Sequence, residues 1–355
     1  MIDLDDPLSY GVDRSGMFAH IERLGTELET AWAQSAGMSI PGGVFTNVVV
    51  AAMGGSAAAA DYFAALVEPG SPLPVQVVRG YTLPGFVQAG TLVVALSYSG
   101  STEEVLACFR EATRRGATTL AISSGGDLLP AAEALGGACY PVRYDSPPRA
   151  ALAHLLAPLL RLAQRLGLAA LCDDDIAVAA NAHTQLVASH IGREVSEARN
   201  AAKQLAHLLL EAQPLLVVGA EHLSAAARRT RNQFAENTKL FAAFEEAPEV
   251  THNVIEALRA PGAAHPAAVA FDSPKLHPGN RRRYELISQL FDEAGGAMAT
   301  LQMRGTSRLA DMLEATAWGD HLSCYAAVLL GIDPTPTPGL IRVREGTTGG
   351  APVGG

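Results

Sequence analysis

The chain has 355 residues, of which 48% are apolar and 17% charged, and its formal net charge is −10. A chain of this length is typical of two domains, each with its own core. The excess of acidic residues argues against a nucleic-acid binder, which usually carries a basic surface. An anionic ligand would therefore have to be bound locally, by backbone amides, hydroxyl groups and a few cations.

The cysteines and the N-terminus exclude several further classes of protein. The four cysteines form no CxxC or Cys/His cluster, so we expect neither a zinc site nor a disulfide framework. The first residues, Met1–Asp6, are acidic and lack the order of a signal peptide. Because no apolar run approaches the ~20 residues that span a bilayer, we expect a cytoplasmic protein. The cysteines are Cys108, Cys139, Cys172 and Cys324.

The first half of the chain predicts alternating strands and helices. Residues 14–35 carry apolar side chains at helical spacing and predict a leading helix. The strands that follow are short and continuously apolar, which is typical of a parallel sheet covered on both faces. We expect strands over 44–52, 75–78, 92–96, 119–122 and 138–142, and helices over 103–115 and 129–135.

The second half repeats this pattern after a helical stretch rich in Ala and Leu. A strand is expected over 214–220, followed by a helix over 224–244. Further strands are expected over 267–271 and 298–303, and further helices over 282–294 and 309–330. The predicted organisation is an N-terminal domain over 1–150, a helical bridge over 151–210, a C-terminal domain over 211–345 and a disordered Gly/Thr/Pro-rich tail over 346–355.

Two predicted strands of the first domain end in glycines and hydroxyl residues, Gly54-Gly55-Ser56 and Ser97-Tyr98-Ser99-Gly100-Ser101-Thr102. In a parallel α/β sheet, ligands bind beyond the carboxyl ends of the strands, where helix N-termini present free amides. Glycine lets the backbone approach an anion, and hydroxyl groups donate hydrogen bonds without adding charge. Each loop alone is compatible with an ordinary turn or helix cap, and Thr102 suits an N-cap. Together they predict a phosphate site.

Two motifs of the second half complete a resemblance to a known family. Glu236-Asn237 and the stretch Pro248-Glu249-x-x-His252-Asn253, taken with the two loops, resemble sugar isomerase (SIS) domain proteins. More narrowly, they are similar to the bifunctional phosphoglucose/phosphomannose isomerase family, from about Met17 to Arg344. The resemblance implies an α/β fold of two flavodoxin-like SIS domains, each a parallel sheet flanked by helices. It also implies a metal-independent enzyme without cofactor, active as a homodimer with a shared active site and binding neither nucleic acid nor membrane.

The resemblance further implies roles for single residues. Arg149 would lie near the reacting carbons and stabilise the enediolate oxygen. Glu236 would be the base that moves a proton between C1 and C2. His252, contributed by the neighbouring subunit, would help to open the sugar ring. The substrate phosphate would be bound by Gly55, Ser56, Ser97, Ser99 and Thr102.

Three positions depart from the family pattern. Thr251 stands where Asn is usual and Val254 where Glu is usual, and Arg344 replaces a lysine that takes part in ring opening. Arginine keeps the positive charge but resists giving up a proton. Two hypotheses follow. The chain is an aldose–ketose isomerase that interconverts glucose 6-phosphate, mannose 6-phosphate or both with fructose 6-phosphate through a cis-enediol, or it is a non-catalytic phosphosugar-binding protein, acting as a sensor or an enzyme partner.

Overall fold

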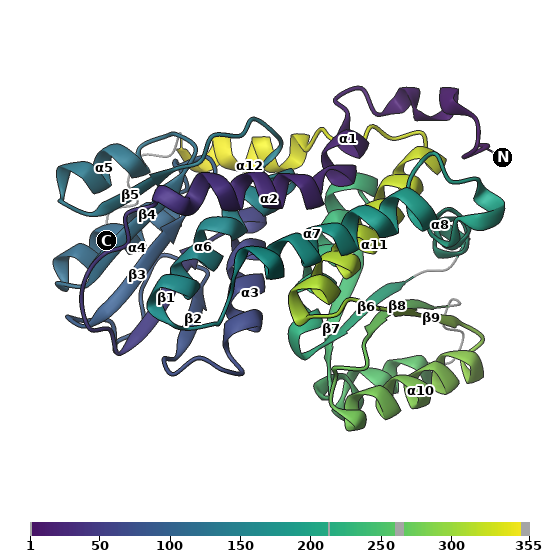
Figure 1. Cartoon of the computed structure of the whole chain (residues 1–355). Coiled ribbons are helices and arrows are strands. Elements are labelled where there is room, and N and C mark those ends of the chain that lie inside the picture. The colour runs from purple at the N-terminus through teal and green to yellow at the C-terminus, as the bar shows by residue number, and fades with distance from the viewer. Residues whose placement is uncertain (1, 212–213, 260–265, 349–355) are drawn as a thin grey trace.

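The structure, a computed structural model, describes residues 2–211, 214–259 and 266–348. Two α/β domains lie side by side, and long helices run between them (Figure 1). Each domain contains its own parallel sheet flanked by helices, so the predicted fold class is confirmed.

The first domain contains a sheet of five parallel strands in the order β2-β1-β3-β4-β5, which is the flavodoxin-like order. Its central strands consist mainly of valine, alanine and leucine, and they are almost completely buried because helices cover both faces. The strands are β1 (Asn47–Ala52), β2 (Val75–Val78), β3 (Thr91–Leu96), β4 (Thr118–Ser123) and β5 (Ala138–Pro141). The helices packed on them are α3 (Gly54–Val67), α4 (Glu103–Arg114) and α5 (Leu128–Ala134).

The second domain contains four parallel strands in the order β7-β6-β8-β9. These strands are β6 (Leu215–Ala220), β7 (Ala242–Ala247), β8 (Ala267–Asp272) and β9 (Ala297–Gln302). The helices that follow β6, β8 and β9 are α9 (Ser224–Gln233), α10 (Pro278–Glu293) and α11 (Arg308–Leu329). The second sheet therefore repeats the connectivity of β1 to β4 in the first.

The helix predicted over residues 224–244 is wrong in its second half. α9 passes into a π-helical turn over Phe234–Thr238, and Lys239 then adopts a left-handed backbone conformation with φ of 63°. The chain next enters β7, an edge strand of the sheet. β7 carries Glu245 and Glu246 and is only partly buried, so it lacks the apolar composition by which the other strands are recognised.

A layer of helices runs along both domains, outside the helices that pack on the sheets. Its members are α1 (Met17–Glu22), α2 (Leu24–Gln34), α6 (Leu152–Leu166), α7 (Asp173–Leu186), α8 (Ala201–Glu211) and α11. The predicted leading helix is thus two helices, because α1 packs on α11 whereas α2 packs on α6 and α7. α11 is 22 residues long and buried on nearly all sides, which is typical of a helix inside a large core.

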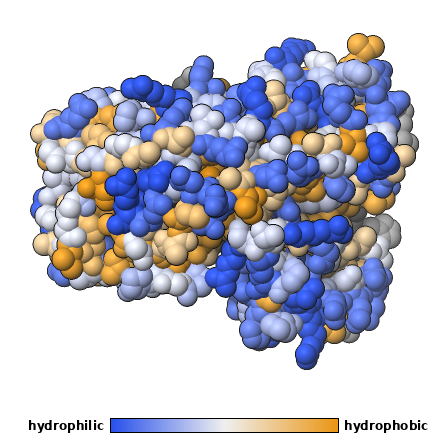
Figure 2. All heavy atoms as spheres, in the orientation of Figure 1, coloured by the Kyte–Doolittle hydropathy of each residue, from blue (hydrophilic) through white to orange (hydrophobic). Residues whose placement is uncertain are grey.

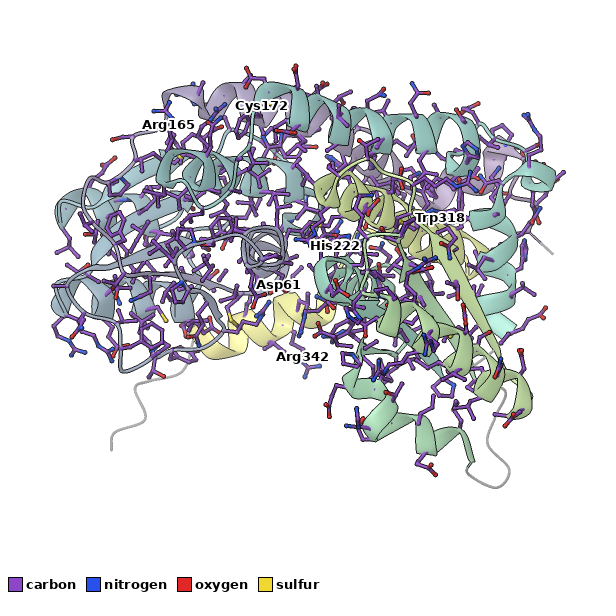
Figure 3. The ribbon with its side chains drawn as sticks, turned by 60° about the horizontal axis from the view of Figure 1, so that its bottom comes forward. Asp61, Arg165, Cys172, His222, Trp318 and Arg342 are labelled. Carbon is purple, nitrogen blue, oxygen red and sulfur yellow. The ribbon has the colours of Figure 1, made fainter. Side chains whose placement is uncertain are left out.

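Shorter helical segments connect these elements. They lie at Pro7–Val12, Ser35–Gly37, Pro148–Ala150, Val187–Ile191, Glu197–Arg199, Glu221–Leu223, Glu249–His252 and Val254–Arg259. A last helix, α12 (Pro338–Thr348), lies on the first-domain side of the molecule (Figures 1 and 3). The predicted tail therefore begins inside α12, and residues 349–355 lie outside the described residues.

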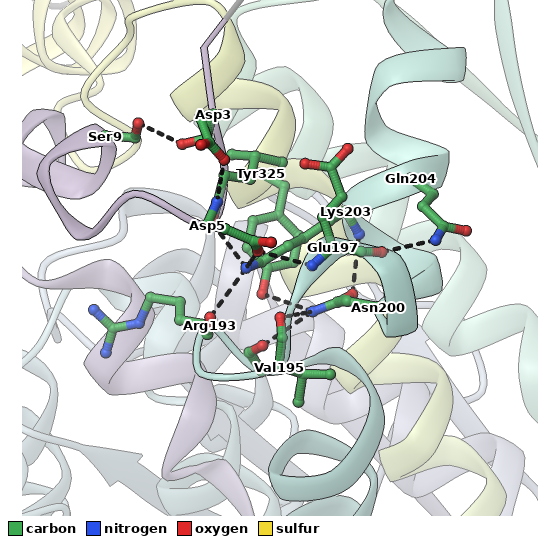
Figure 4. Close-up of polar contacts among 12 residues, drawn as sticks. Asp3, Asp5, Ser9, Arg193, Val195, Glu197, Asn200, Lys203, Gln204 and Tyr325 are labelled. Carbon is green, nitrogen blue, oxygen red and sulfur yellow. Dashed lines mark hydrogen bonds and ion pairs between the residues drawn. The ribbon is translucent and has the colours of Figure 1, made fainter.

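A fully buried lysine fixes the N-terminal segment to α8 (Figure 4). The Lys203 ammonium donates to the carbonyl of Leu4 at 2.7 Å, to the Asp5 carboxylate at 2.9 Å and to the carbonyl of Arg193 at 3.1 Å. The hydrogen bond from Lys203 is the main reason that the pKa of Asp5 is lowered. Three acceptors thus replace the water that this cation has lost, as a buried charge requires.

The two domains are also joined by polar contacts between α3 and helices of the second half. The Tyr62 hydroxyl forms a hydrogen bond with the Thr316 hydroxyl at 2.6 Å. Oδ2 of Asp61, which Figure 3 labels on α3, lies 3.8 Å from Nε of Arg228 on α9. On the surface, hydrophobic side chains are scattered over the first domain, whereas the region around α10 is mainly hydrophilic (Figure 2). In the described part of the chain, no helix combines the length and the apolar character that crossing a membrane requires.

His183 of α7 is fully buried, and neither of its ring nitrogens has a hydrogen-bond partner among the described residues. Burial, and after it the neighbouring His321, lowers the pKa of His183 to about 3. The folded protein therefore holds a neutral imidazole, while the unfolded chain protonates the same group near its ordinary pKa of ~6.5.

We expect His183 to lower stability as the pH falls from about 6.5 towards 3, by up to about 1.4 kcal/mol per pH unit. The sign follows because the unfolded state binds the proton and the folded state does not. His183→Leu should flatten this part of the pH profile of the unfolding free energy, measured by urea denaturation. His190→Leu, which changes an exposed histidine just beyond the same helix, should leave the profile unchanged. An equal slope in His183→Leu and the wild type would contradict the expectation.

Candidate active site

The two predicted phosphate loops lie next to each other at the carboxyl edge of the first sheet. β1 and β3 are neighbours and pair Ala52 with Leu96, so the segments that follow them start side by side. The hydroxyl of Ser56 accepts a hydrogen bond from the amide of Tyr98 at 3.0 Å and links the two loops. Both loops lead directly into the N-termini of long helices, α3 and α4.

The hydroxyl groups of the second loop face one another. Thr102 occupies the predicted N-cap position of α4, yet within the described structure its side chain caps no helix amide. Its Oγ1 lies 2.8 Å from Ser97 Oγ and 3.5 Å from Ser99 Oγ. Gly100 has φ of 69°, and a Cβ added there would stand 1.7 Å from the carbonyl oxygen of Gly125. The loop therefore requires glycine at position 100, and it brings the hydroxyls of Ser97, Ser99 and Thr102 together at the start of α4.

A tyrosine connects this loop to the segment that carries Arg149. The Tyr98 hydroxyl donates to the carbonyl of Tyr144 at 2.6 Å and accepts from the amide of Ser146 at 3.0 Å. Gly55 completes the connection, since a Cβ added to it would lie 3.1 Å from the Cα of Arg149. The phosphate loops and the backbone of Arg149 are thus in direct contact.

The guanidinium of Arg149 is the centre of the site. It is buried, with a side-chain exposure of 4%, and its acceptors among the described residues come from the second half of the chain. Nε donates to Asn237 Oδ1 at 3.0 Å, and Nη1 lies 3.4 Å from Glu236 Oε2. Nη2 donates to the carbonyls of Pro334 at 2.6 Å and Thr335 at 3.0 Å. Burial lowers the pKa of Arg149 and Glu236 opposes this shift, but a guanidinium remains charged in proteins.

The π-helical turn at the end of α9 presents two consecutive side chains to Arg149. Glu236 keeps a side-chain exposure of 25% and so remains accessible to a ligand. Asn237 is fully buried, and its amide group donates to Ser323 Oγ at 2.9 Å, which turns its carbonyl oxygen towards Arg149. π-helical turns are frequent at functional sites because they redirect side chains that a regular helix would separate.

A network of buried charged and polar side chains holds the backbone of Arg149. Nη2 of Arg229 donates to both carboxylate oxygens of Asp320, at 2.8 and 2.9 Å, and Nη1 donates to the carbonyl of Arg149 at 3.0 Å. Gln233 donates to the same carboxylate at 2.7 Å. Burial, the largest single influence, lowers the pKa of Arg229, but the charge and hydrogen bond of Asp320 together with Tyr62 and Glu236 outweigh it and raise that pKa. Because a buried ion pair adds little net stability, its clearest effect here is to fix the backbone of Arg149.

Lys239 is a site residue that sequence reasoning missed. Its ammonium donates to the carbonyl of Pro336 at 2.8 Å and to the carbonyl of Glu236. Burial, followed by the charge of Arg149, lowers the pKa of Lys239. Together, Arg149 and Lys239 hold three successive carbonyls of the Pro334–Pro336 segment, which leads into α12. The only sequence signal for Lys239 is its position three residues after Glu236, and this does not reveal which segment it contacts.

The predicted site residues are therefore brought together only in part. Arg149 and Glu236 meet beside the phosphate loops that carry Gly55, Ser56, Ser97, Ser99 and Thr102. His252 lies in the short helix after β7 and is exposed, and no hydrogen bond or ion pair between described residues joins it to Arg149 or Glu236. Arg344 lies on α12 with an exposed side chain. The described residues contain no group of three His, Cys, Asp or Glu side chains that could hold a metal ion.

Comparison with known proteins agrees with this architecture. The SIS domain family matches residues 46–132, and the family described as bacterial phospho-glucose isomerase C-terminal SIS domain matches residues 198–346. Among solved structures, a hypothetical protein from Thermus thermophilus superposes with a TM-score of 0.67 at 17% identity, covering 96% of this chain and 94% of that one. A glucose-6-phosphate isomerase like protein from the same organism gives a TM-score of 0.58 at 21% identity, covering 97% and 99%. These structures share the fold.

Sequence relatives extend the likeness to the family. The bifunctional phosphoglucose/phosphomannose isomerase of Caldicellulosiruptor bescii is 31% identical over 326 residues, which cover 90% of this chain and 95% of that protein. The protein of the same name from Aquifex aeolicus is 30% identical over 305 residues, covering 85% and 90%. Matches of this extent include both domains and the site between them. The chain belongs to the bifunctional phosphoglucose/phosphomannose isomerase family.

Proposed function

We propose that this protein interconverts glucose 6-phosphate, mannose 6-phosphate or both with fructose 6-phosphate. The observation that carries the proposal is the position of Arg149, whose backbone contacts Gly55 of the phosphate loops and whose guanidinium contacts Glu236. A sugar phosphate bound with its phosphate on the hydroxyl loop would extend past Arg149 towards the Glu236 carboxylate. The names of the relatives support isomerisation over simple binding.

In this mechanism, Glu236 removes the C2 proton of the open-chain aldose and returns it to C1 of the cis-enediol, which gives the ketose. The reverse reaction starts with the C1 proton. Negative charge develops on the oxygen of the enediolate, and Nη1 of Arg149 is the donor placed beside Glu236 to stabilise it. Because Asn237 and the Pro334 and Thr335 carbonyls hold the rest of the guanidinium, it needs little reorganisation during the reaction.

Ring opening requires groups that one chain does not bring to Glu236. His252 is exposed, so we propose that it enters the site of a partner subunit in a cytoplasmic homodimer. An imidazole can exchange a proton with the ring oxygen near neutral pH. Arg344, on the helix that follows the clamped Pro334–Pro336 segment, would stabilise charge near the ring without transferring a proton.

Glu236→Gln tests the base directly. We expect this variant to lose isomerase activity by several orders of magnitude, since an amide cannot accept the proton, while its affinity for fructose 6-phosphate changes less than about tenfold. The assay supplies fructose 6-phosphate and measures glucose 6-phosphate and mannose 6-phosphate separately, with and without a metal chelator.

Glu285→Gln, on the exposed face of α10, is the control and should behave as the wild type. Wild-type turnover that survives in Glu236→Gln would exclude Glu236 as the base. A wild type that binds the sugar phosphates without converting them would instead identify a phosphosugar-binding protein.

Thr102→Val tests the hydroxyl loop. Removing one hydrogen bond to a charged phosphate should raise KM for fructose 6-phosphate by about 10- to 100-fold and leave kcat nearly unchanged, because the phosphate is bound equally in ground state and transition state. Thr113→Val, near the other end of α4, is the matched control, since its hydroxyl donates to the carbonyl of Phe109 within the same helix. Equal KM values for the two variants would rule out this loop as the phosphate site.

Subunit complementation tests the shared site. Co-expression of Glu236→Gln with His252→Ala should give mixed dimers in which one site keeps both groups and the other lacks both. A random mixture should regain about a quarter of the wild-type activity, because half of the dimers are mixed and each has one intact site. Glu236→Gln co-expressed with Glu236→Ala should regain none. Absence of recovery in the first mixture would place His252 in its own subunit's site or outside catalysis.

A further inference from the structure

The second domain contains a structural counterpart of the phosphate site. β1 and β3 are six residues long and pair from Asn47 with Thr91, and β6 and β8 are six residues long and pair from Leu215 with Ala267. Positions beyond the strand ends therefore correspond one to one. Ser273 is the first residue after β8, as Ser97 is after β3, and the two serines correspond.

Two further positions at this edge carry a different kind of side chain from their counterparts. Lys275, the third residue after β8, corresponds to Ser99, and His222, the second residue after β6, corresponds to Gly54. The edge of the second sheet thus combines a hydroxyl, an ammonium and an imidazole. This donor set is suited to an oxyanion.

These three side chains converge on one carboxylate of the same chain. Asp311, in the first turn of α11, is completely buried and accepts from Ser273 Oγ at 2.6 Å. The ammonium of Lys275 lies 3.2 Å and the His222 Nε2 3.3 Å from the same Oδ2. His222 is nearly fully buried, and its Nδ1 has no partner in the described ranges (Figure 3 shows His222 at the domain junction).

The first domain has no such carboxylate in the corresponding place. β9 and β4 occupy the same position in their sheets, so α11 corresponds to α5. α5 begins after Gly125 and Gly126, and the acidic residue at its start, Asp127, is exposed. The space in front of the hydroxyl loop is bordered there by glycine instead of by a buried acid.

We propose that the Asp311 carboxylate occupies, in the second domain, the place that the phosphate of the ligand takes in the first. The second domain is then an oxyanion site that the chain itself has filled, and each chain binds one sugar phosphate instead of two. The inference rests on the proposed function only in taking the hydroxyl loop as a phosphate site. Removing the Asp311 side chain would open a site for a small carboxylate, for which formate is the probe.

Formate rescue of Asp311→Ala tests this. Loss of the carboxylate removes the acceptor of Ser273 and His222 and leaves Lys275 with the carbonyl of Gly305, so the thermal midpoint should fall by on the order of 10 °C. Formate should restore at least half of this loss in a saturable manner, compared with chloride at the same ionic strength. Asp311→Asn is the matched control, because its amide fills the space and should allow no saturable gain.

A formate response of Asp311→Ala no larger than that of Asp311→Asn and the wild type would overturn the proposal. If Asp311→Ala is unfolded in chloride, folding that depends on formate supports the proposal equally well. Asp311→Ser, which leaves a similar opening, gives an independent second reading, and failure of formate in both variants also overturns it. Isomerase activity is measured separately on the wild type, so its absence and the absence of rescue are distinguishable.

Discussion

The architecture of the site depends on the contacts that the buried guanidinium of Arg149 makes. Its backbone contacts Gly55 in the first domain, and its side chain contacts Glu236, Asn237 and the Pro334–Pro336 segment in the second. A cation buried this deeply is stable only when acceptors surround it. The second half of the chain supplies those acceptors while the backbone of Arg149 belongs to the first domain, so this buried charge fixes the geometry of the junction.

The two domains share a fold but differ in the residues at the carboxyl ends of their strands. In the first, strand ends bear glycines and hydroxyl groups that contact one another and leave the N-terminus of α4 accessible. In the second, the corresponding strand ends are occupied by Asp311 and its three donors. We propose that a ligand binds the hydroxyl groups of the first copy, whereas in the second the hydroxyl, the ammonium and the imidazole contact a carboxylate of the same chain.

Much of the fold follows from local sequence patterns, because buried parallel strands are continuous apolar runs ended by glycine or polar residues. The strand β7 could not be predicted in this way, because an edge strand with Glu245 and Glu246 does not need an apolar composition. At the candidate site, the hydroxyl loop was predicted from its residues, and Arg149 and Glu236 from the family resemblance; the structure brings Arg149 into contact with Gly55 and Glu236. Lys239 contacts Pro336, which lies 97 residues further along the chain. Asp311 contacts Ser273, which lies 38 residues before it, through the packing of α11 on the second sheet. Sequence periodicity does not bring such distant residues together.

The Pro334–Pro336 segment has a further consequence. A guanidinium in water is surrounded by mobile water dipoles. In this protein the carbonyls of Pro334 and Thr335 take the place of the water around Nη2 of Arg149. The last stretch of the polypeptide therefore acts as fixed solvent for an arginine that precedes it by nearly two hundred residues. A product that ends before Pro334 lacks both carbonyls, so we expect its Arg149 guanidinium to lose this part of its fixed surroundings.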